Sequence, residues 1–279
     1  MRITLYIIIF FNAVAMNSLQ AYIILCDLGG TFVDVDQITY AKDELGIGPL
    51  FAYGLTNFLN FNPQKRIFQT LEKIGGTQSV ITHENRDNAV PKIYCDWMAG
   101  AYEDHQALRE YILQEIDKLY QESFFSSYLE YCIVYNAINA MFCPEKLVQH
   151  QYLIKPMVAL LERIDPAEHT LVAVTNWDPH SYPLFLESPV GQKIAQHIKK
   201  EHMIVSGYIK YNKPHEGFYQ HIFDTYGHDN KQKYLFIDND ITNIKAAQEL
   251  GIPSIHFTGD VSAIEQALID RGIIYEKRV

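Results

Sequence analysis

YIILCDLGGTFVDVD, residues 22–36, is a short apolar run that stops at Asp27 and continues into two glycines and Thr31. Such a run is typical of a strand that is buried on both faces of a parallel sheet. One interpretation is an ordinary strand and turn, in which Asp27 bonds to nearby backbone. The other is a nucleophilic carboxylate at the carboxyl end of a parallel strand, where open α/β sheets place their reactive groups. The rest of the chain must distinguish the two.

The composition indicates a packed globular protein with an acidic surface. The chain has 279 residues, of which 48% are hydrophobic and 20% are charged. Lys and Arg number 23 against 33 Asp and Glu, which gives a formal net charge of −10. With this charge and no long basic run, we expect no nucleic-acid partner. A cationic cofactor suits an acidic chain better.

Residues 1–21, MRITLYIIIFFNAVAMNSLQA, resemble a secretory signal peptide. Arg2 gives a positive start, an apolar run follows, and Ala21 supplies a small residue directly before the first expected strand. The run is shorter than the roughly 20 apolar residues of a membrane span. We therefore expect an exported protein, periplasmic or secreted, without a stable membrane span after cleavage. The alternative is a cytoplasmic chain in which this segment is the first element of the fold.

The cysteines indicate neither a zinc site nor a dithiol motif. Cys26, Cys95, Cys132 and Cys143 form no C-x-x-C pair and have no zinc-ligand spacing with histidine. Cys26 lies inside the apolar run, so we expect it in the core. An exported chain has room for one disulfide among the other three, and the pairing is left open.

Four further apolar runs predict strands, at residues 170–178, 203–209, 233–240 and 253–257. Helical patterns separate most of them. The clearest one places Ile244, Ala247 and Leu250 on one face and ends at Gly251. Strands that alternate with helices predict an α/β fold with a Rossmann-like, doubly wound parallel sheet.

Residues 37–149 have a different pattern. Residues 105–122, HQALREYILQEIDKLYQE, carry Leu108, Tyr111, Ile112, Ile116 and Leu119 at helical spacing, and residues 123–142 are apolar and aromatic without alternation. We expect a core of residues 22–36 and 150–279 and an inserted, mostly α-helical cap of residues 37–149, preceded by the leader 1–21. Most of the aromatic residues of the insertion are expected in its core.

Polar residues follow four of the five expected strands in a fixed order. Each has an ordinary alternative as a helix cap, an exposed lysine or a loop acid. Their joint occurrence at strand ends indicates one site. The set comprises Asp27, then Thr175 and Asn176, then Lys213, and finally Asp238, Asn239 and Asp240, with Asn243 behind.

This set of residue types suits transfer of a phosphoryl group. An aspartate that attacks phosphorus needs its charge screened from the phosphate, and Mg²⁺ held by Asp27, a nearby carbonyl and a strand-end acid or amide provides that. The equatorial phosphoryl oxygens need donors and a cation. Thr175, backbone N–H groups near Asn176, and Lys213 can supply them.

These motifs resemble those of the haloacid dehalogenase (HAD) superfamily, with a helical C1-type cap inserted after the first motif. "CDLGGT" is similar to motif one, "LVAVTNWD" to motif two, "SGYIKYNKPHEGFY" to the lysine motif and "YLFIDNDITNIKAAQELGIPSIHF" to motif four. The resemblance covers nearly everything after residue 21. It implies a Rossmann-like core, Mg²⁺ and a phosphatase that works through an aspartyl-phosphate.

The resemblance also implies roles for individual residues. Asp27 is the nucleophile, Thr175 and Asn176 bind substrate phosphate, and Lys213 holds both the phosphate and the nucleophile. The expected metal donors are Asp27, the Gly29 carbonyl, Asp238 and Asn239. The expected substrate is a small phosphomonoester or a phosphoprotein. The sequence predicts neither the exact substrate nor the oligomeric state.

Two positions depart from the pattern of HAD phosphatases. Gly29 stands where many carry an aspartate that acts as general acid, and Asn239 stands in place of a metal-binding carboxylate. A dehalogenase, which attacks carbon without Mg²⁺, lacks both aspartates, although its fourth motif differs from "FIDND". A weakly active or inactive binding protein with the same fold is the other alternative.

Overall fold

A five-stranded parallel sheet forms the centre of the computed structural model, which describes residues 21–36, 39, 63–79 and 89–275. Its strand order is β7-β6-β1-β8-β9. Every neighbouring pair in this sheet is parallel. The strands are β1 (Ile23–Cys26), β6 (Thr170–Thr175), β7 (Met203–Val205), β8 (Tyr234–Asp238) and β9 (Ser254–His256). This order, which runs outward in both directions from β1, confirms the expected doubly wound α/β fold.

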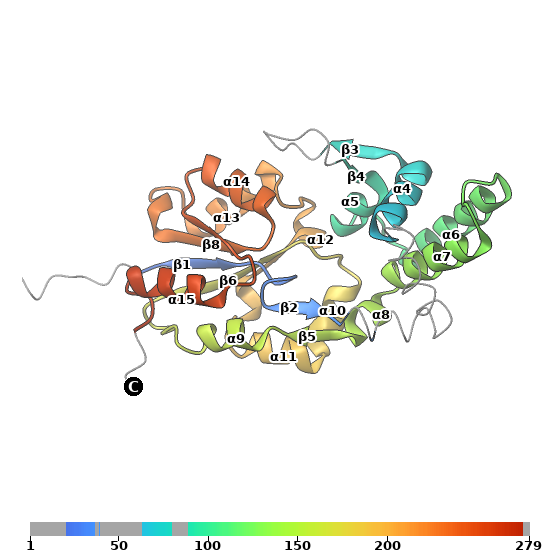
Figure 1. Ribbon diagram of the computed structural model, residues 1–279. Coiled ribbons are helices and arrows are strands. Elements are labelled where there is room, and N and C mark those ends of the chain that lie inside the picture. The colour runs from blue at the N-terminus through green and yellow to red at the C-terminus, as the bar shows by residue number, and fades with distance from the viewer. Residues whose placement is uncertain (1–20, 37–38, 40–62, 80–88, 276–279) are drawn as a thin grey trace, which may run out of the picture.

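Both faces of the sheet are covered by helices because its strands are apolar on both sides. Ile24 and Cys26 belong to one buried cluster, whereas Leu25 belongs to a second cluster on the opposite face. The first face packs against α9 (Lys155–Leu161), α10 (Ser181–Glu187), α11 (Pro189–Ala195) and α15 (Val261–Asp270). The second packs against α13 (Glu216–Tyr226) and α14 (Ile241–Glu249). Figure 1 shows α13 and α14 on one side of the sheet and α9, α11 and α15 on the other.

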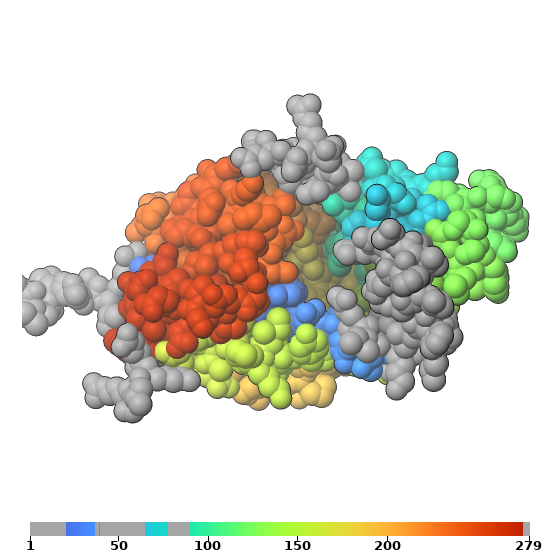
Figure 2. All heavy atoms as spheres, in the orientation of Figure 1, coloured from blue at the N-terminus to red at the C-terminus, as the bar shows by residue number. Residues whose placement is uncertain are grey.

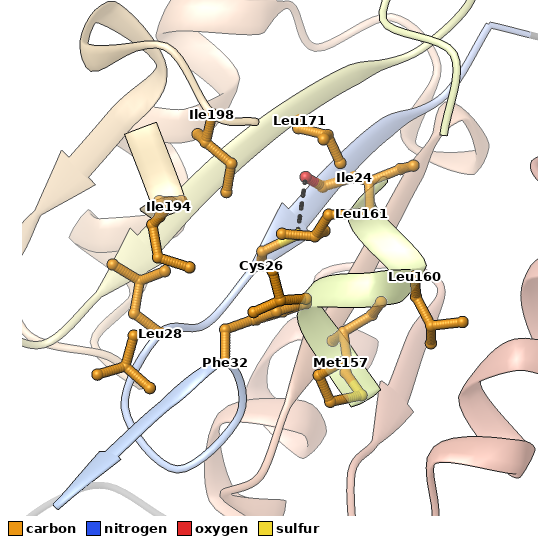
Figure 3. Close-up of a cluster of buried hydrophobic side chains, with 14 of the residues drawn as sticks. Ile24, Cys26, Leu28, Phe32, Met157, Leu160, Leu161, Leu171, Ile194 and Ile198 are labelled. Carbon is orange, nitrogen blue, oxygen red and sulfur yellow. Dashed lines mark hydrogen bonds between the residues drawn. The ribbon is translucent and has the colours of Figure 1, made fainter. Parts of the chain in front are cut away.

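Cys26 lies in the core, as expected. It contributes to the cluster that joins β1 to α9 and α11, and its thiol donates to the Ile24 carbonyl at 3.7 Å (Figure 3). Burial raises the pKa of this thiol well above its usual range. All four cysteines are free, so no pair among Cys95, Cys132 and Cys143 is bridged.

The sequence-based expectation for residues 203–209 is wrong in its second half. β7 ends at Val205, and Ser206–Ile209 form the short helix α12. Gly207 explains the turn, because a Cβ at this position would lie only 2.7 Å from the backbone nitrogen of Pro179. The chain therefore turns against the loop after β6, and the residues before Lys213 are not extended.

A separate hydrophobic cluster holds together the elements between β2 (Val33–Val35) and β5 (Gln151–Leu153). These elements are α4 (Pro63–Gly75), β3 (Thr77–Ser79), β4 (Ala89–Pro91), α5 (Lys92–Met98), α6 (His105–Gln121), α7 (Tyr128–Met141) and α8 (Pro144–Gln149). We call the described residues 63–79 and 89–149 the helical segment. Its cluster includes Leu71, Trp97, Ile112 and Val134, and excludes every residue of the parallel sheet. Figure 2 shows the helical segment set apart from α13–α15, with a recess between them.

Two contacts close the ends of this insertion. β2 pairs with β5 in antiparallel register, with Val33 opposite Leu153. The Asp36 amide also donates to the His150 carbonyl at 2.9 Å. These contacts lie beside the predicted boundaries at residues 36 and 150, and the division into core and cap remains a prediction. Within the segment, α6 buries Leu108, Ile112, Ile116 and Leu119 as expected, whereas Tyr111 is exposed.

The predicted leader 1–21 lies outside the described residues, except for Ala21. Among the helices that the structure describes, none combines the length and the apolar character needed to cross a membrane.

The partly buried ion pair Arg66–Glu130 provides a test of the packing of the helical segment. Arg66 donates to Glu130 at 2.5 Å, and Ser126 donates to the same carboxylate from its amide at 2.5 Å. Burial alone would raise the pKa of Glu130, but the bonds from Ser126 and Arg66 outweigh it and lower the pKa. The stabilisation from Glu130 is thus fully present above the ordinary pKa that the group has in the unfolded chain. It is lost as the pH falls through the lowered pKa of the folded state.

We predict that Glu130→Ala lowers the free energy of unfolding at pH 7 by about 2 kcal/mol, because it leaves Arg66 without its charge partner. Urea unfolding measures the change. The matched control is Glu115→Ala, which removes an exposed ion pair with Lys118 and should cost less than about 0.5 kcal/mol. Equal losses for the two variants would contradict this account of the packing.

Candidate active site

Parallel pairing of β1 and β8 brings two aspartates together at the carboxyl edge of the sheet. Cys26 lies opposite Ile237 in the register, so Asp27 and Asp238, the next residue of each strand segment, are neighbours. The Asp27 amide also donates to the Ile237 carbonyl at 2.9 Å. Asp27 is 6% exposed and Asp238 is fully buried. Two neighbouring buried carboxylates need a compensating charge, because an unpaired buried charge is costly.

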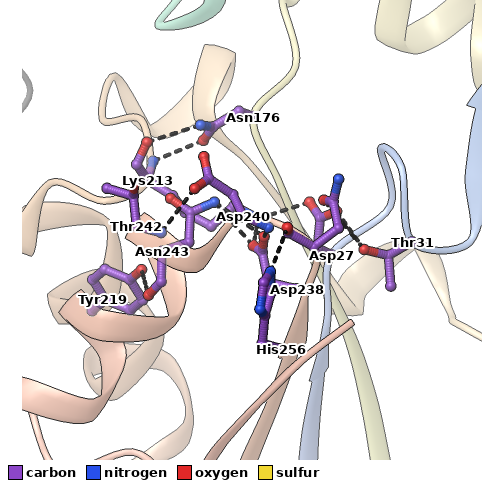
Figure 4. Close-up of polar contacts among 11 residues, drawn as sticks. Asp27, Thr31, Asn176, Lys213, Tyr219, Asp238, Asp240, Thr242, Asn243 and His256 are labelled. Carbon is purple, nitrogen blue, oxygen red and sulfur yellow. Dashed lines mark hydrogen bonds and ion pairs between the residues drawn. The ribbon is translucent and has the colours of Figure 1, made fainter. Parts of the chain in front are cut away.

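Lys213 supplies that charge from the loop after α12. Its Nζ atom lies 2.7 Å from Asp27 Oδ1 and 2.7 Å from Asp238 Oδ2 (Figure 4). The side chain is almost completely buried, at 4% exposure. Burial alone would lower the pKa of Lys213, but the charges of Asp238 and Asp27 raise it above its usual value. The lysine is therefore a fixed cation between two carboxylates.

The Asp27 carboxyl keeps an elevated pKa in this setting. Burial raises the pKa of Asp27, the Lys213 charge lowers it, the Asp238 charge raises it, and the hydrogen bonds from Lys213 and Thr31 lower it. The net result is a pKa of about 7. Thr31 Oγ1 donates to Asp27 Oδ2 at 3.0 Å. A further cation near Asp27 would favour its ionised, nucleophilic form.

Asp238 is occupied by protein donors at both oxygens. Oδ1 accepts from the Asp240 amide at 2.7 Å and Oδ2 accepts from Lys213, while the Asn243 side-chain amide reaches both at 3.1–3.2 Å. Tyr219 donates to the Asn243 carbonyl at 2.8 Å and so fixes the first turn of α14. Asp238 thus acts as the anchor of Lys213 and of the strand-to-helix turn.

Asn239 faces the same space as Asp27 from the next strand. The oxygens Asn239 Oδ1 and Asp27 Oδ2 both approach Thr31 Oγ1, at 3.5 and 3.0 Å. His256 bonds the Asn239 carbonyl at 3.0 Å and holds this residue from β9. An amide oxygen and a carboxylate oxygen from two neighbouring strands therefore converge.

These residues fit Mg²⁺ as a set of oxygen donors. Asp27 offers a carboxylate, Asn239 an amide oxygen and Gly29, two residues after Asp27, a main-chain carbonyl. A hard cation prefers such oxygen ligands. Across the described ranges, no group of three or more His, Cys, Asp or Glu side chains can hold a metal. A cation here would thus depend on one carboxylate and on neutral oxygens.

The remaining predicted residues occupy different positions around the triad of Asp27, Lys213 and Asp238. Thr175 is the last residue of β6, beside β1, and is 1% exposed. It does not cap the next helix, because the Asp178 side chain accepts from the His180 and Ser181 amides there. The Asn176 side chain binds the main chain of Lys213: the Lys213 amide donates to Oδ1 at 2.7 Å, and Nδ2 donates to the Lys213 carbonyl at 2.9 Å.

Two contributors to the site were not assigned roles from the sequence. Thr31 donates to the Asp27 carboxylate, four residues earlier in the chain. In the sequence, the hydroxyl residue directly after the glycine pair could have indicated this contact. Asn243 bonds Asp238 and stands one turn into the helix after it, which is a helical spacing that points a side chain back at the strand end.

The two glycines after Asp27 have opposite surroundings. A Cβ at Gly29 would meet nothing within 4 Å. A Cβ at Gly30 would lie 2.3 Å from Asn239 Nδ2, and Gly30 has a φ of +75°. Gly30 is thus required by the close approach of Asn239, whereas position 29 has space for a side chain.

We predict that Gly29→Asp leaves the folded state intact, whereas Gly30→Ala lowers the free energy of unfolding by about 1–2 kcal/mol through strain at positive φ and displacement of Asn239. Urea unfolding of both variants checks this. Gly29→Ala is the control for the added Cβ alone. Loss of folding in Gly29→Ala would contradict the open space at position 29.

Comparisons with known proteins bear on the fold. No protein-family model and no curated protein matches the chain. Among solved structures, a dehalogenase is 14% identical with a TM-score of 0.50, over 88% of this chain and 87% of that one. A HAD family enzyme from Bacteroides thetaiotaomicron, solved as an Asp-to-Ala mutant with magnesium and inorganic phosphate, is 17% identical with a TM-score of 0.49, over 84% and 93%.

L-2-haloacid dehalogenase from Xanthobacter autotrophicus, with chloropropionic acid covalently bound, is 12% identical with a TM-score of 0.46, over 91% of this chain and 84% of that one. At these identities the similarity concerns the fold, and the dehalogenase match at a TM-score of 0.50 carries it. Together with the β7-β6-β1-β8-β9 parallel sheet, it shows that the chain has the haloacid dehalogenase fold.

Proposed function

We propose that this protein is a Mg²⁺-dependent HAD-like phosphatase that hydrolyses a phosphomonoester through an aspartyl-phosphate on Asp27. The observation that carries the proposal is the geometry of the triad: Lys213 lies 2.7 Å from both Asp27 and Asp238 at the carboxyl edge of the sheet. Such an arrangement keeps a buried carboxylate ready for attack and places a cation beside the incoming phosphate.

In the first step an Asp27 carboxylate oxygen attacks phosphorus, and the bond from phosphorus to the ester oxygen breaks. The leaving alkoxide takes a proton from solvent, because position 29 has no carboxylic acid to donate one. In the second step water attacks the aspartyl-phosphate and releases inorganic phosphate, which restores Asp27. Lys213 stays paired with Asp238 throughout, and its remaining donor capacity faces the phosphoryl oxygens.

Thr175 and the main chain after it are the proposed phosphate donors. Thr175 lies next to β1 at the same sheet edge as Asp27, so its hydroxyl suits a phosphoryl oxygen. The Asn176 side chain is already bonded to Lys213 at both ends. We therefore assign substrate contact at residue 176 to its main-chain N–H.

Asp27, the Gly29 carbonyl and the Asn239 amide oxygen are the residues that would hold Mg²⁺. When bound, the cation neutralises charge on the phosphate and on Asp27. Asp238 contributes through Lys213, because both of its oxygens accept from protein donors.

The helical segment is the proposed cap, and the recess between it and α13–α15 is the proposed entrance for the substrate. We further propose that the protein is exported, on the pattern of residues 1–21. The substrate class remains a small phosphomonoester or a phosphoprotein.

Hydrolysis at carbon is a second candidate function, and one observation favours it. Asn239 replaces a carboxylate, and all four carboxylate oxygens of Asp27 and Asp238 accept from protein donors in the described structure, so little negative charge is left to hold a cation. A dehalogenase-like enzyme would use the same nucleophile without a metal. Halide release without Mg²⁺ would identify it, whereas phosphate release that needs Mg²⁺ identifies the phosphatase.

We predict that Asp27→Asn reduces phosphate release at least about 10³-fold, because an amide is a poor nucleophile and a weaker metal ligand. The fold should survive, since Lys213 keeps Asp238 as its partner. A screen of phosphomonoesters with and without Mg²⁺, together with thermal unfolding of both proteins, provides the measurement. Near-normal turnover by the folded variant would rule out Asp27 as the nucleophile.

We predict that Asn239→Asp lowers the Mg²⁺ concentration for half-maximal activity about tenfold, because a hard cation prefers a charged oxygen. Activity is titrated against Mg²⁺ for both proteins. Asp240→Asn is the matched control: Asp240 lies next to position 239, but its side chain caps α14 through the Thr242 amide. A similar Mg²⁺ response in the two variants would show that Asn239 is no metal ligand.

A further inference from the structure

The stretch from Ser206 to Lys213 connects the proposed catalytic lysine to the helical segment. It consists of α12 and the loop that follows, and α12 lies beside α5 (Figure 1). Three of its side chains donate to main-chain carbonyls of the helical segment. Ser206 Oγ donates to Met98 at 2.7 Å, Lys210 Nζ to Gly100 at 2.5 Å and Asn212 Nδ2 to Cys95 at 2.7 Å.

The three acceptors lie at the C-terminal end of α5 or just after it. Helix ends leave carbonyls free to accept from outside the helix. The Cys95 carbonyl accepts from the Ala99 amide at 2.9 Å as well as from Asn212. The stretch from Ser206 to Lys213 thus supplies hydrogen-bond donors to the C-terminal end of α5 in the helical segment, including a lysine at the negative end of the helix dipole. The contact is close: a Cβ at Gly100 would lie 2.3 Å from the Gly207 carbonyl oxygen. The end of α5 and the start of α12 are therefore held in one relative position.

The same stretch is held from the opposite side by the core. Asn176, at the end of β6, makes its two bonds to the main chain of Lys213. The Asn212 bond to Cys95 and the Asn176 bonds to Lys213 act on adjacent residues. The main chain that presents the lysine is thus fixed between the sheet and the helical segment.

Asn212 is poorly explained by stability alone. Its Nδ2 atom makes the bond to Cys95, but its Oδ1 atom is buried without a hydrogen-bond partner among the described residues. An unpartnered buried polar atom costs free energy, which offsets much of what one hydrogen bond contributes. The Asn212 bond to Cys95 therefore adds little net stability. Its main effect is to fix the direction of the loop that carries Lys213.

We infer that Asn212, through its bond to the Cys95 carbonyl at the end of α5, is a positioning residue for Lys213. This deepens the proposed function, on which its catalytic consequence rests. The helical segment then has two tasks, because besides covering the site it holds the proposed catalytic lysine in register with Asp27.

The first test uses hydrogen exchange, which needs no activity. Amide hydrogen exchange of peptides spanning residues 207–218 is measured by mass spectrometry in the full-length parent protein and in its Asn212→Ala variant. We expect exchange at the Lys213 amide to rise at least about tenfold, because its bond to Asn176 opens more often. The matched control is His180→Ala. His180 lies in the loop after β6, and its Nε2 atom bonds the Tyr102 carbonyl of the helical segment at 3.0 Å, so the variant also removes a hydrogen bond to that segment. Exchange near Lys213 should not change in the control.

Lys210→Met provides a second variant if Asn212→Ala does not fold. Lys210 is exposed, and the change removes only its bond to the Gly100 carbonyl, so the same faster exchange is expected. Unchanged exchange near Lys213, or an equal rise in His180→Ala, would overturn the inference whether or not the protein is a phosphatase.

The second test uses kinetics on whichever phosphomonoester is hydrolysed. In Asn212→Ala, kcat should fall about tenfold with KM within twofold, because a small displacement of a catalytic group slows the chemical step. His180→Ala should leave kcat unchanged. Faster exchange without a fall in kcat would show that the loop is held but that its position does not limit catalysis, and would overturn the catalytic part. A protein without any phosphatase activity would refute the proposed function and leave the exchange result to decide the inference.

Discussion

Two buried carboxylates at the same sheet edge create the electrostatic problem around which the site is built. Asp27 and Asp238 become neighbours through the pairing of β1 with β8, and neither has full access to water. Without Lys213 the pair would carry two uncompensated charges in a region of low dielectric, at a cost of several kcal/mol. The lysine is itself buried, so its own desolvation is offset only because both carboxylates accept from it. Each member of the triad therefore depends on the other two.

The need to hold this triad explains the polar groups around it. Asn243, the Asp240 amide and Tyr219 fix Asp238 and the first turn of α14. Asn176 fixes the Lys213 main chain. These bonds use neutral donors and acceptors, so they orient the charged groups without changing the net charge of the site. Buried polar networks are stabilising only when nearly every member is satisfied. Among the described residues of this network, the Asn243 Oδ1 atom is buried without a hydrogen-bond partner.

The local charge also explains the departure at position 239. With both carboxylates ionised, Asp27, Asp238 and Lys213 sum to −1, and a carboxylate at 239 would add a third negative charge next to Thr31. With an amide there, the site carries one negative charge fewer than with a carboxylate, and we expect a lower affinity for a divalent cation. The amide of Asn239 thus reduces repulsion within the site and also limits the negative charge available to a bound cation. The open space at Gly29 is a separate feature, since nothing packs against that position.

Much of the fold and of the site could be predicted from the sequence because both follow from local patterns. Apolar runs mark the five strands, alternation with helices implies the parallel sheet, and residues that end parallel strands must share one edge. The same reasoning predicted Asp27, Thr175 and Asp238 at one sheet edge and Lys213 after the third expected strand; their roles remain predictions. Gly251, with a φ of +82°, also ends its helix where expected.

Only the tertiary structure decided how the side chains at that edge are used. The turn of residues 206–209 into a helix depends on close packing of Gly207 against Pro179 and Trp177, which the apolar run does not reveal. Asn176 points to the main chain of a residue 37 positions away, and Asn212 to a carbonyl 117 positions away. Hydrogen bonds of this kind depend on distances and directions across the folded chain, whereas sequence patterns report burial and periodicity along it. The identity of an amide is therefore readable from the sequence, but its partner is determined by the fold.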